Sequence, residues 1–201
     1  MSLSIDTHDT HQRIHDLVWG GFHTDADIGK IITEEYLDPD SLSAEDRAWV
    51  DAEVLRQSGA KHEAEATWPS QTEYDRLDAV FVKLRSENYI ALHNAGNTLS
   101  DGHDDVQEIW RAAGRFESGI RGCCFYHSQD LDRAVHAGKL NLAFSGAMIP
   151  EAEQREENTR AVARHIVGLL RAAGFVAQWS GDLHTRIEVD LGMWRKRSKR
   201  R

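Results

Sequence analysis

Two short polar clusters in this chain have the side chains that metal ligation or acid–base chemistry requires. They comprise His93, Asn94, Ser100, Asp101, His103 and Asp104 in the first cluster, and Tyr126, His127, Gln129 and Asp130 in the second. Imidazole nitrogens and carboxylate oxygens ligate divalent cations, and a carboxylate can orient a histidine that acts as a general base. The two clusters together are therefore a candidate ligand pocket. No metal site is firmly predicted, and the candidate metal ligands within the pocket are His93, His103, Asp104 and His127.

Both clusters follow segments that we predict to be strands. Residues 89–92 and 123–126 are short and apolar, and each leads through polar residues into a predicted helix. If these strands are parallel neighbours, both clusters lie at the carboxyl edge of the sheet, where open α/β sheets usually bind ligands. A structural interpretation competes with this one and is the one we favour. Ser100 and Ser128 are suitable helix N-caps, and aspartates favour the positive end of a helix dipole.

Hydrophobic spacing along the chain predicts an α+β fold. Helical periodicity is found in residues 8–19, 25–37, 43–66, 72–84, 103–112, 128–137 and 151–173. Strand patterns are found in residues 89–92, 123–126, 140–144, 175–179 and 185–191. We predict a mixed sheet of about five strands, with helices mainly on one face and a helical N-terminal subdomain.

The alternative to this prediction is a three-layer α/β fold. Two layers are preferred because the last two strands are joined at Ser180-Gly181-Asp182, which is a typical hairpin signal. In addition, residues 140–144 alternate in polarity, whereas the strands of three-layer proteins are apolar throughout.

The charge of the chain is unevenly distributed. The net charge is −9, and the last seven residues, Arg195–Arg201, carry six positive charges, which leaves −15 on residues 1–194. An acidic body argues against a general nucleic-acid binder, because contacts to phosphates need a basic surface. We expect residues 1–66 to form a helical subdomain that packs with an α+β region, 67–194, as one domain. Residues 195–201 are expected to be a disordered basic tail.

Several classes of protein lack support in the composition. The only cysteines, Cys123 and Cys124, are adjacent, so a disulfide framework is not expected. The longest apolar runs are far shorter than the roughly 20 residues that cross a bilayer, and the first ten residues are polar. Glycine-rich phosphate-binding loops are absent. We therefore expect a cytoplasmic protein without a membrane contact, and we predict no cofactor.

The segment from Cys124 to Val135 (Cys-Phe-Tyr-His-Ser-Gln-Asp-Leu-Asp-Arg-Ala-Val) resembles an uncharacterised bacterial domain family. The resemblance extends over roughly residues 68–194, from Trp68-Pro69 to Trp194. Some members of that family carry a cysteine-rich segment after the first strand, where this chain has Ala-Gly-Asn-Thr-Leu-Ser at 95–100. A metal or redox role of such relatives therefore does not transfer, and the resemblance implies no activity.

The function that follows from these features is a non-catalytic binding or interaction module, for which a protein partner is plausible. A small metal-dependent hydrolase that uses the histidines and aspartates at the strand ends is the first alternative. Contact with RNA through Arg195–Arg201 is the second alternative, and it is the only way in which we expect nucleic acid to bind.

Overall fold

A computed structural model describes residues 3–147 and 152–199. The chain divides into two compact units. The N-terminal unit comprises Met1–Thr72 together with Arg195–Arg201, and the sheet unit comprises Glu73–Trp194. The boundary expected after residue 66 thus lies at Thr72, and the packing of the two units as one domain stays a prediction. No helix among the described residues is long and apolar enough to cross a membrane.

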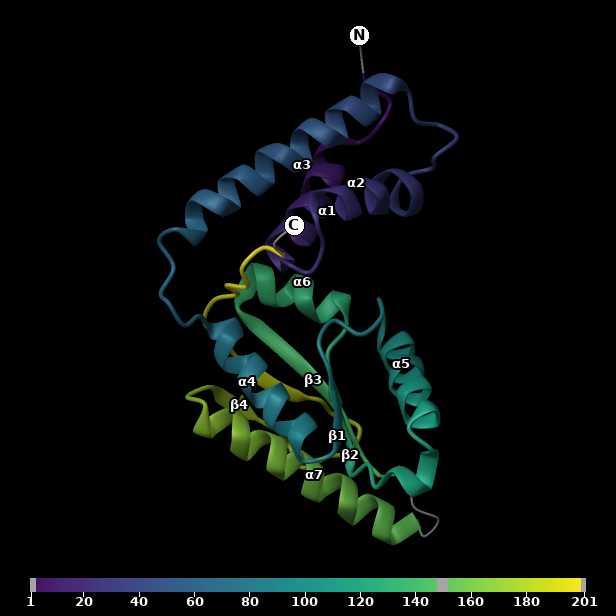
Figure 1. Cartoon of the computed structure of the whole chain (residues 1–201), viewed down its shortest axis with the longest axis vertical. Coiled ribbons are helices and arrows are strands. Elements are labelled where there is room, and N and C mark those ends of the chain that lie inside the picture. Colours follow the sequence, from purple (N-terminus) through teal and green to yellow (C-terminus); the bar gives the residue numbers. More distant parts are fainter. Residues whose placement is uncertain (1–2, 148–151, 200–201) are drawn as a thin grey trace. The chain divides into compact units, whose positions relative to one another are not determined.

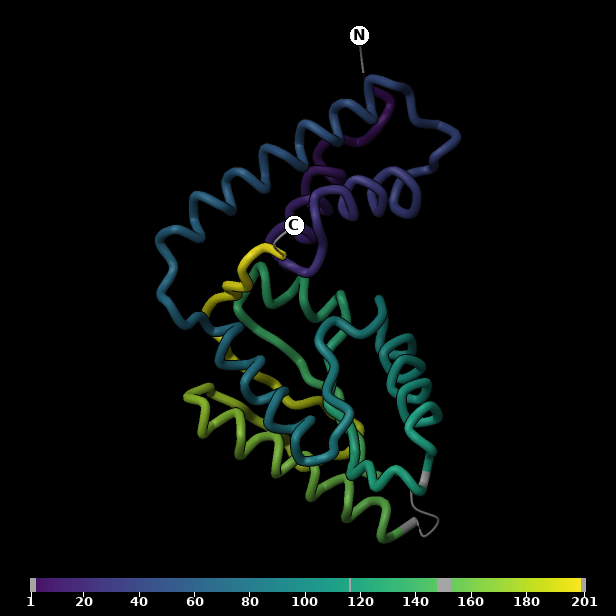
Figure 2. Tube along the Cα trace, viewed as in Figure 1, coloured from purple at the N-terminus to yellow at the C-terminus, as the bar shows by residue number. Residues whose placement is uncertain are grey.

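Helices form the N-terminal unit (Figure 1 and Figure 2). They are α1 (Thr7–Gly20), α2 (Asp25–Lys30), the π-helical turn η1 (Ile31–Tyr36) and α3 (Ala44–Glu65). Two capping boxes start α2 and α3, because the hydroxyls of Thr24 and Ser43 accept from the backbone N–H three residues later. The helices bury a common core of Ile14, Leu17, Val18, Ile28, Ile32, Val50 and Val54.

The sheet unit contains a five-stranded mixed sheet, as predicted. Its strands are β1 (Tyr89–Leu92), β2 (Gly122–Phe125), β3 (Lys139–Gly146), β4 (Val176–Gln178) and β5 (Ile187–Asp190), in the spatial order β1-β2-β3-β5-β4. β1 and β2 are parallel, and the other pairs are antiparallel. The final two strands pair with each other, which agrees with the hairpin signal in the sequence.

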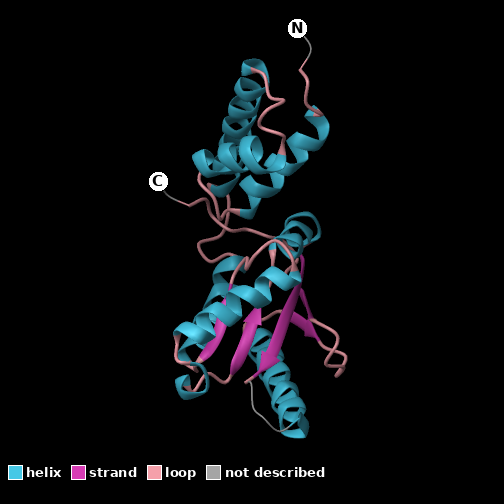
Figure 3. Ribbon diagram, turned by 90° about the vertical axis from the view of Figure 1, so that its right-hand side faces the viewer, coloured by secondary structure: helices cyan, strands magenta, loops and turns pink. Residues whose placement is uncertain are grey.

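Helices lie on both faces of this sheet, but unequally (Figure 3). They are α4 (Glu73–Ser86), α5 (Leu99–Ala112), the 3₁₀ turn η2 (Arg115–Ser118), α6 (Ser128–Ala137) and α7 (Ala152–Ala172). Tyr89 of β1 stacks on His165 of α7, whereas its neighbour Ile90 belongs to the cluster that packs against α5. Successive strand residues point to opposite faces, so α5 and α7 cover opposite sides of the sheet. The architecture is α+β, in agreement with the sequence-based prediction.

Two predicted helix N-caps differ from those in the structure. Thr98, not Ser100, caps α5, and its hydroxyl accepts from the N–H of Asp101 while Asp101 accepts in return from Thr98. The helix starts at Leu99, so Ser100 already lies inside its first turn. In α6 the cap position belongs to His127, because Ser128 is the first helical residue. The hydroxyl of Ser128 does not cap the helix but donates to the carbonyl of Gly96.

Gly102 allows α5 to approach the sheet closely. A Cβ atom at this position would lie 2.3 Å from Cε2 of Phe125 and 3.0 Å from the carbonyl oxygen of Ala95. Alanine normally stabilises a helix by about 0.5–1 kcal/mol relative to glycine, but overpacking a tight contact costs about 1–3 kcal/mol. We therefore expect Gly102→Ala to lower the free energy of unfolding by about 2 kcal/mol in urea denaturation.

The matched control for this prediction is Gly168→Ala in α7. A Cβ atom there has nothing within 4 Å, so the helix propensity of alanine should act alone and raise stability by about 0.5 kcal/mol. Equal stability changes at Gly102 and Gly168 would contradict the proposed close packing of α5.

Candidate functional site

The parallel pairing of β1 and β2 brings the two predicted polar clusters together in the chain trace. The segments beyond the strands run side by side, since Ala95 N–H donates to the carbonyl of Tyr126 at 2.8 Å. Ser128 N–H donates in turn to the carbonyl of Gly96 at 3.1 Å. The condition on which the candidate pocket depended, namely parallel neighbouring strands, is thus met. A ligand pocket formed by these residues nevertheless stays a prediction.

His93 is held between two partners at the end of β1. Its Nε2 lies 3.0 Å from Oδ1 of Asp78, and its Nδ1 lies 3.0 Å from the hydroxyl of Tyr126. The imidazole also stacks on Phe81, with 4.1 Å between the ring centroids. Tyr126 is fully buried, and burial raises the pKa of its hydroxyl well above the usual range. The hydrogen-bonded series Asp78–His93–Tyr126 therefore runs from a partly exposed carboxylate to a hydroxyl inside the protein.

His127 and Asp130 form a second buried group at the end of β2. Nε2 of His127 lies 3.0 Å from Oδ2 of Asp130, and the guanidinium of Arg186 donates to the same oxygen at 2.6 Å. Asp130 is 1% exposed and His127 is 4% exposed. Burial is the main cause of a lowered pKa of His127, and the negative charge of Asp130 opposes it. At neutral pH the imidazole is thus uncharged beside an ion pair.

The other predicted site residues have structural or exposed positions. Asn94 has a left-handed backbone, with φ of 52°, and its side-chain oxygen accepts from the hydroxyl of Ser128 at 3.0 Å. Asp101 accepts from the N–H groups of Asn97 and Thr98, which lowers the pKa of its carboxyl. His103 is exposed and lies with its ring edge towards Phe125.

The remaining three residues, Ser100, Asp104 and Gln129, have exposed side chains. Among the described residues, no three of His93, His103, Asp104 and His127 form a group whose donor atoms lie within 4.8 Å of one another. Because a metal site requires ligands that converge on one point, the strand ends as they stand favour the structural interpretation.

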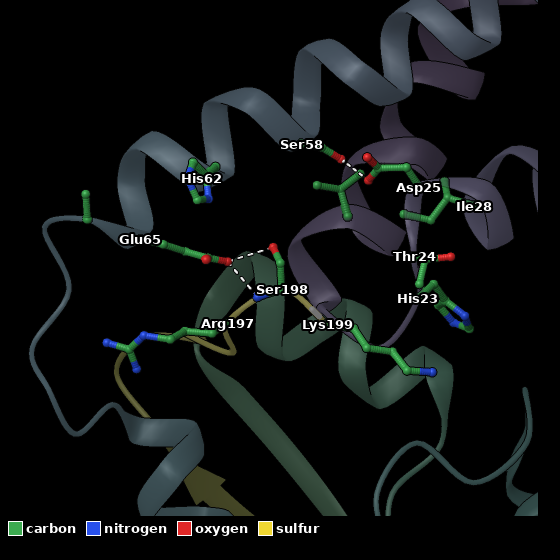
Figure 4. A pocket seen from close by; sticks show the side chains of 12 residues that line it. His23, Thr24, Asp25, Ile28, Ser58, His62, Glu65, Arg197, Ser198 and Lys199 are labelled. Atoms are coloured by element: carbon green, nitrogen blue, oxygen red, sulfur yellow. Dashed lines mark hydrogen bonds between the residues drawn. The ribbon is translucent and has the colours of Figure 1, made fainter. Parts of the chain in front are cut away.

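A pocket that the sequence did not indicate lies in the N-terminal unit (Figure 4). We name it the tail pocket. It has a volume of about 630 Å³, and it is lined by Val18, His23, Thr24, Asp25, Ile28, Ser58, His62, Glu65, Ala66, Arg197, Ser198 and Lys199. Its walls therefore come from both ends of the sequence, from the first three helices and from the C-terminal basic segment.

Within the C-terminal segment expected to be a disordered tail, residues 196–198 have defined contacts, and residues 200–201 lie outside the described residues. Backbone N–H and hydroxyl of Ser198 donate to the same oxygen of Glu65, at 2.6 and 2.7 Å (Figure 4). The guanidinium of Arg197 donates to the carbonyl of Pro69 at 2.7 Å, and Lys196 lies over the ring of Phe22. Residues 195–199 are positioned because acceptors and an aromatic face in the N-terminal unit match their donors and charges.

Lys61 is a fully buried cation beside this segment. Its side chain is 0% exposed, and its ammonium donates to the carbonyl of Val18 at 3.0 Å. Oε1 of Glu65 lies 3.6 Å away. Burial lowers the pKa of Lys61 to about 8, although Glu65 opposes the shift. The C-terminal segment is thus anchored at Glu65, a carboxylate that a buried lysine already attracts.

The chain matches a known protein family over most of its length. Residues 5–198 match a family described as Domain of unknown function (DUF6891). The chain belongs to this family. The match covers the N-terminal helices and most of the basic segment, so the family extends well beyond residues 68–194, over which the sequence resemblance was noted. No curated protein and no solved structure matches the chain.

Sequence reasoning missed the tail pocket for an identifiable reason. Ser198 lies 133 residues from its acceptor Glu65, and no local pattern connects the two. The one available signal was the contrast between an acidic body and a basic C-terminus, which indicated that the tail could contact its own body. Lys61 gave no signal, since a lysine in a polar helical segment is normally exposed.

Proposed function

We propose that this DUF6891 protein is a binding module without catalytic activity, and that its ligand is a small anionic molecule taken up in the tail pocket. The observation that carries the proposal is a pocket whose wall includes two cationic side chains of the C-terminal segment, Arg197 and Lys199. Its volume of about 630 Å³ falls within the range of roughly 300–1,000 Å³ that is usual for small-molecule sites.

The cationic side chains in the wall of the tail pocket are groups that suit an anion. Lys61 and the two donors of Ser198 already compensate the carboxylate of Glu65. Asp25 is the other carboxylate in the wall, and Arg197 and Lys199 are its cationic side chains. Guanidinium and ammonium groups bind carboxylates and phosphates through charge-assisted hydrogen bonds.

The neutral groups in the wall suit recognition of a polar ligand. Burial is the main cause of a lowered pKa of His23, so its imidazole is uncharged at pH 7 and offers one donor and one acceptor. The hydroxyl of Ser58 donates to Asp25 and that of Ser198 to Glu65, both at 2.7 Å. These serine hydroxyls donate to carboxylates, whereas a serine nucleophile is activated by donation to a histidine. Binding is therefore preferred over catalysis.

The two alternatives have less support. A hydrolase would require His93, His103, Asp104 and His127 to act together, but His103 and Asp104 are exposed while His127 is buried. Contact with RNA through Arg195–Arg201 would compete with the hydrogen bonds that Arg197 and Ser198 make within the N-terminal unit.

Thermal melting with anionic probes tests the proposal. We expect millimolar pyrophosphate or citrate to raise the melting temperature of the full chain, because a ligand that binds only the folded state stabilises it by mass action. Glucose, a neutral probe of comparable size, should have no effect. In Lys199→Gln, the affinity for pyrophosphate in calorimetric titration should fall about tenfold, which is typical of the loss of one charge-assisted hydrogen bond.

Lys30→Gln is the matched control, since Lys30 is exposed on α2 and does not line the tail pocket. Its affinity for pyrophosphate should equal that of the wild type. The proposal is wrong if neither anion shifts the melting temperature, or if Lys199→Gln and Lys30→Gln bind pyrophosphate equally well.

A further inference from the structure

Helix α5 leaves a cavity between itself and the sheet. His103, Val106, Gln107 and Trp110 line it, and their spacing of three and four residues places them on one face of the helix. Gly102 is the one described residue of α5 that is fully buried, while Val106 and Trp110 are only partly buried. The apolar face of α5 is therefore closed tightly at its first turn and open further along, where the cavity has a volume of about 230 Å³.

The walls of this cavity are mostly apolar, with His103 and Gln107 as polar members, and Ser145 lies on its floor. We name it the α5 cleft, and its principal residues are Ile90, Val106, Trp110, Ile120, Cys123 and Ser145. Cys123 of β2 and Ser145 of β3 are direct register partners, and the sulfur lies 3.1 Å from the hydroxyl oxygen. Both side chains thus point to the face of the sheet that α5 covers.

The Cys123–Ser145 pair leaves one hydrogen-bonding position for a ligand. The sulfur and the hydroxyl oxygen are 3.1 Å apart, and either group is able to donate to the other. If the thiol donates, the hydroxyl hydrogen of Ser145 is available to a group in the cleft, and if the hydroxyl donates, its oxygen is available as an acceptor. The described residues show no other hydrogen bond of the Ser145 side chain.

The size of the cleft decides between kinds of occupant. An apolar cavity of about 150 Å³ in a protein interior stays dry and binds benzene. The α5 cleft differs from such a cavity in being partly open to solvent, and at about 230 Å³ it has room for one aromatic ring with a small substituent. Trp110 places an indole in the wall of the cleft, and aromatic pairs are favourable beyond the area that they bury.

We propose that the α5 cleft binds a small aromatic molecule of the phenol class, with its ring between α5 and the sheet and its hydroxyl at Ser145. The carrying observation is an apolar cavity of single-ring size with one hydroxyl on its floor. This site lies wholly within the sheet unit, so it is independent of the anion site proposed for the tail pocket.

Fluorine NMR of the full chain with 4-fluorophenol and fluorobenzene as probes tests the proposal. We expect both probes to bind, and 4-fluorophenol to bind more tightly. Ser145→Ala removes the floor hydroxyl. The affinity for 4-fluorophenol should therefore fall about fivefold, which is the usual effect of one neutral hydrogen bond, and the affinity for fluorobenzene should not change. An equal loss of affinity for the two probes would show that Ser145 affects the shape of the cleft and does not bind the ligand hydroxyl. This result would overturn the assignment of the ligand to the phenol class.

A second test fills the cleft with a larger side chain. Val106→Phe should abolish binding of both probes, whereas Ile109→Phe, on an α5 residue that does not line the cleft, should leave both affinities unchanged. Circular dichroism checks that each variant folds. If Val106→Phe does not fold, Val106→Ile fills less of the cleft and should weaken the binding of both probes. Unaltered binding in a folded Val106 variant, or no binding to the wild type, would refute the site.

Discussion

Replacement of Asp130 by alanine is expected to lower the free energy of unfolding by about 3 kcal/mol. Asp130 is 1% exposed, and its Oδ2 is the common partner of Arg186 at 2.6 Å and His127 at 3.0 Å. Removal of one member of a buried ion pair leaves the other charge without compensation, which costs about 3–5 kcal/mol. The lower end applies here, because Arg186 is 30% exposed and reaches water. Urea denaturation at pH 7 measures the loss.

A matched substitution separates this effect from a general loss of charge. Asp105 is exposed on α5, and Asp105→Ala should change the free energy of unfolding by less than about 0.5 kcal/mol. If Asp130→Ala were as stable as Asp105→Ala, the carboxylate of Asp130 would have no structural role. The proposal that the strand ends bind a ligand would then gain support.

Lys61 is expected to make the stability of the protein rise with pH in the alkaline range. Its pKa is about 8 in the folded protein, against 10.5 in the unfolded chain. Between these values the unfolded state binds more protons, so the free energy of unfolding increases with pH. At about 1.4 kcal/mol per pH unit, the gain between pH 7 and pH 9.5 should be about 2 kcal/mol.

The measurement compares wild type with Lys61→Met at each pH. Other groups that titrate in this range, such as tyrosines, cancel in the difference between the two proteins. The wild type should become about 2 kcal/mol more stable relative to Lys61→Met over this interval, as measured by urea denaturation. Parallel stability curves for the two proteins would mean that Lys61 keeps a normal pKa, which is incompatible with its burial.

Local order in this protein was predictable from its sequence to a large extent. Thr24 with Asp27, and Ser43 with Asp46, form the capping boxes that their three-residue spacing indicates. The spacing of Leu77, Val80, Phe81 and Leu84 places all four side chains in the core, as helical periodicity predicts. These signals succeed because hydrogen bonds and faces within a turn depend on residues three or four apart.

The N-cap of α5 shows where local reasoning becomes ambiguous. Ser100 was predicted as the cap of this helix, whereas Thr98 caps it in the structure. The structure decides for Thr98, and the helix is then in register to place Gly102 against Phe125. The start at Thr98 also has a local cause, because Thr98 and Asp101 have the three-residue spacing of a capping box.

The candidate sites depended almost entirely on tertiary structure. The sequence by itself determined that there are about five strands in a mixed sheet and that His93 and His127 lie at strand ends. It also determined the contrast between an acidic body and a basic C-terminus. Only the fold decided that His93 pairs with Asp78, that Ser198 binds Glu65, and that α5 leaves a cleft above Ser145. The physical reason is that a side chain's partner, burial and pKa depend on residues tens to more than a hundred positions away, whereas periodicity and capping are properties of a single helical turn.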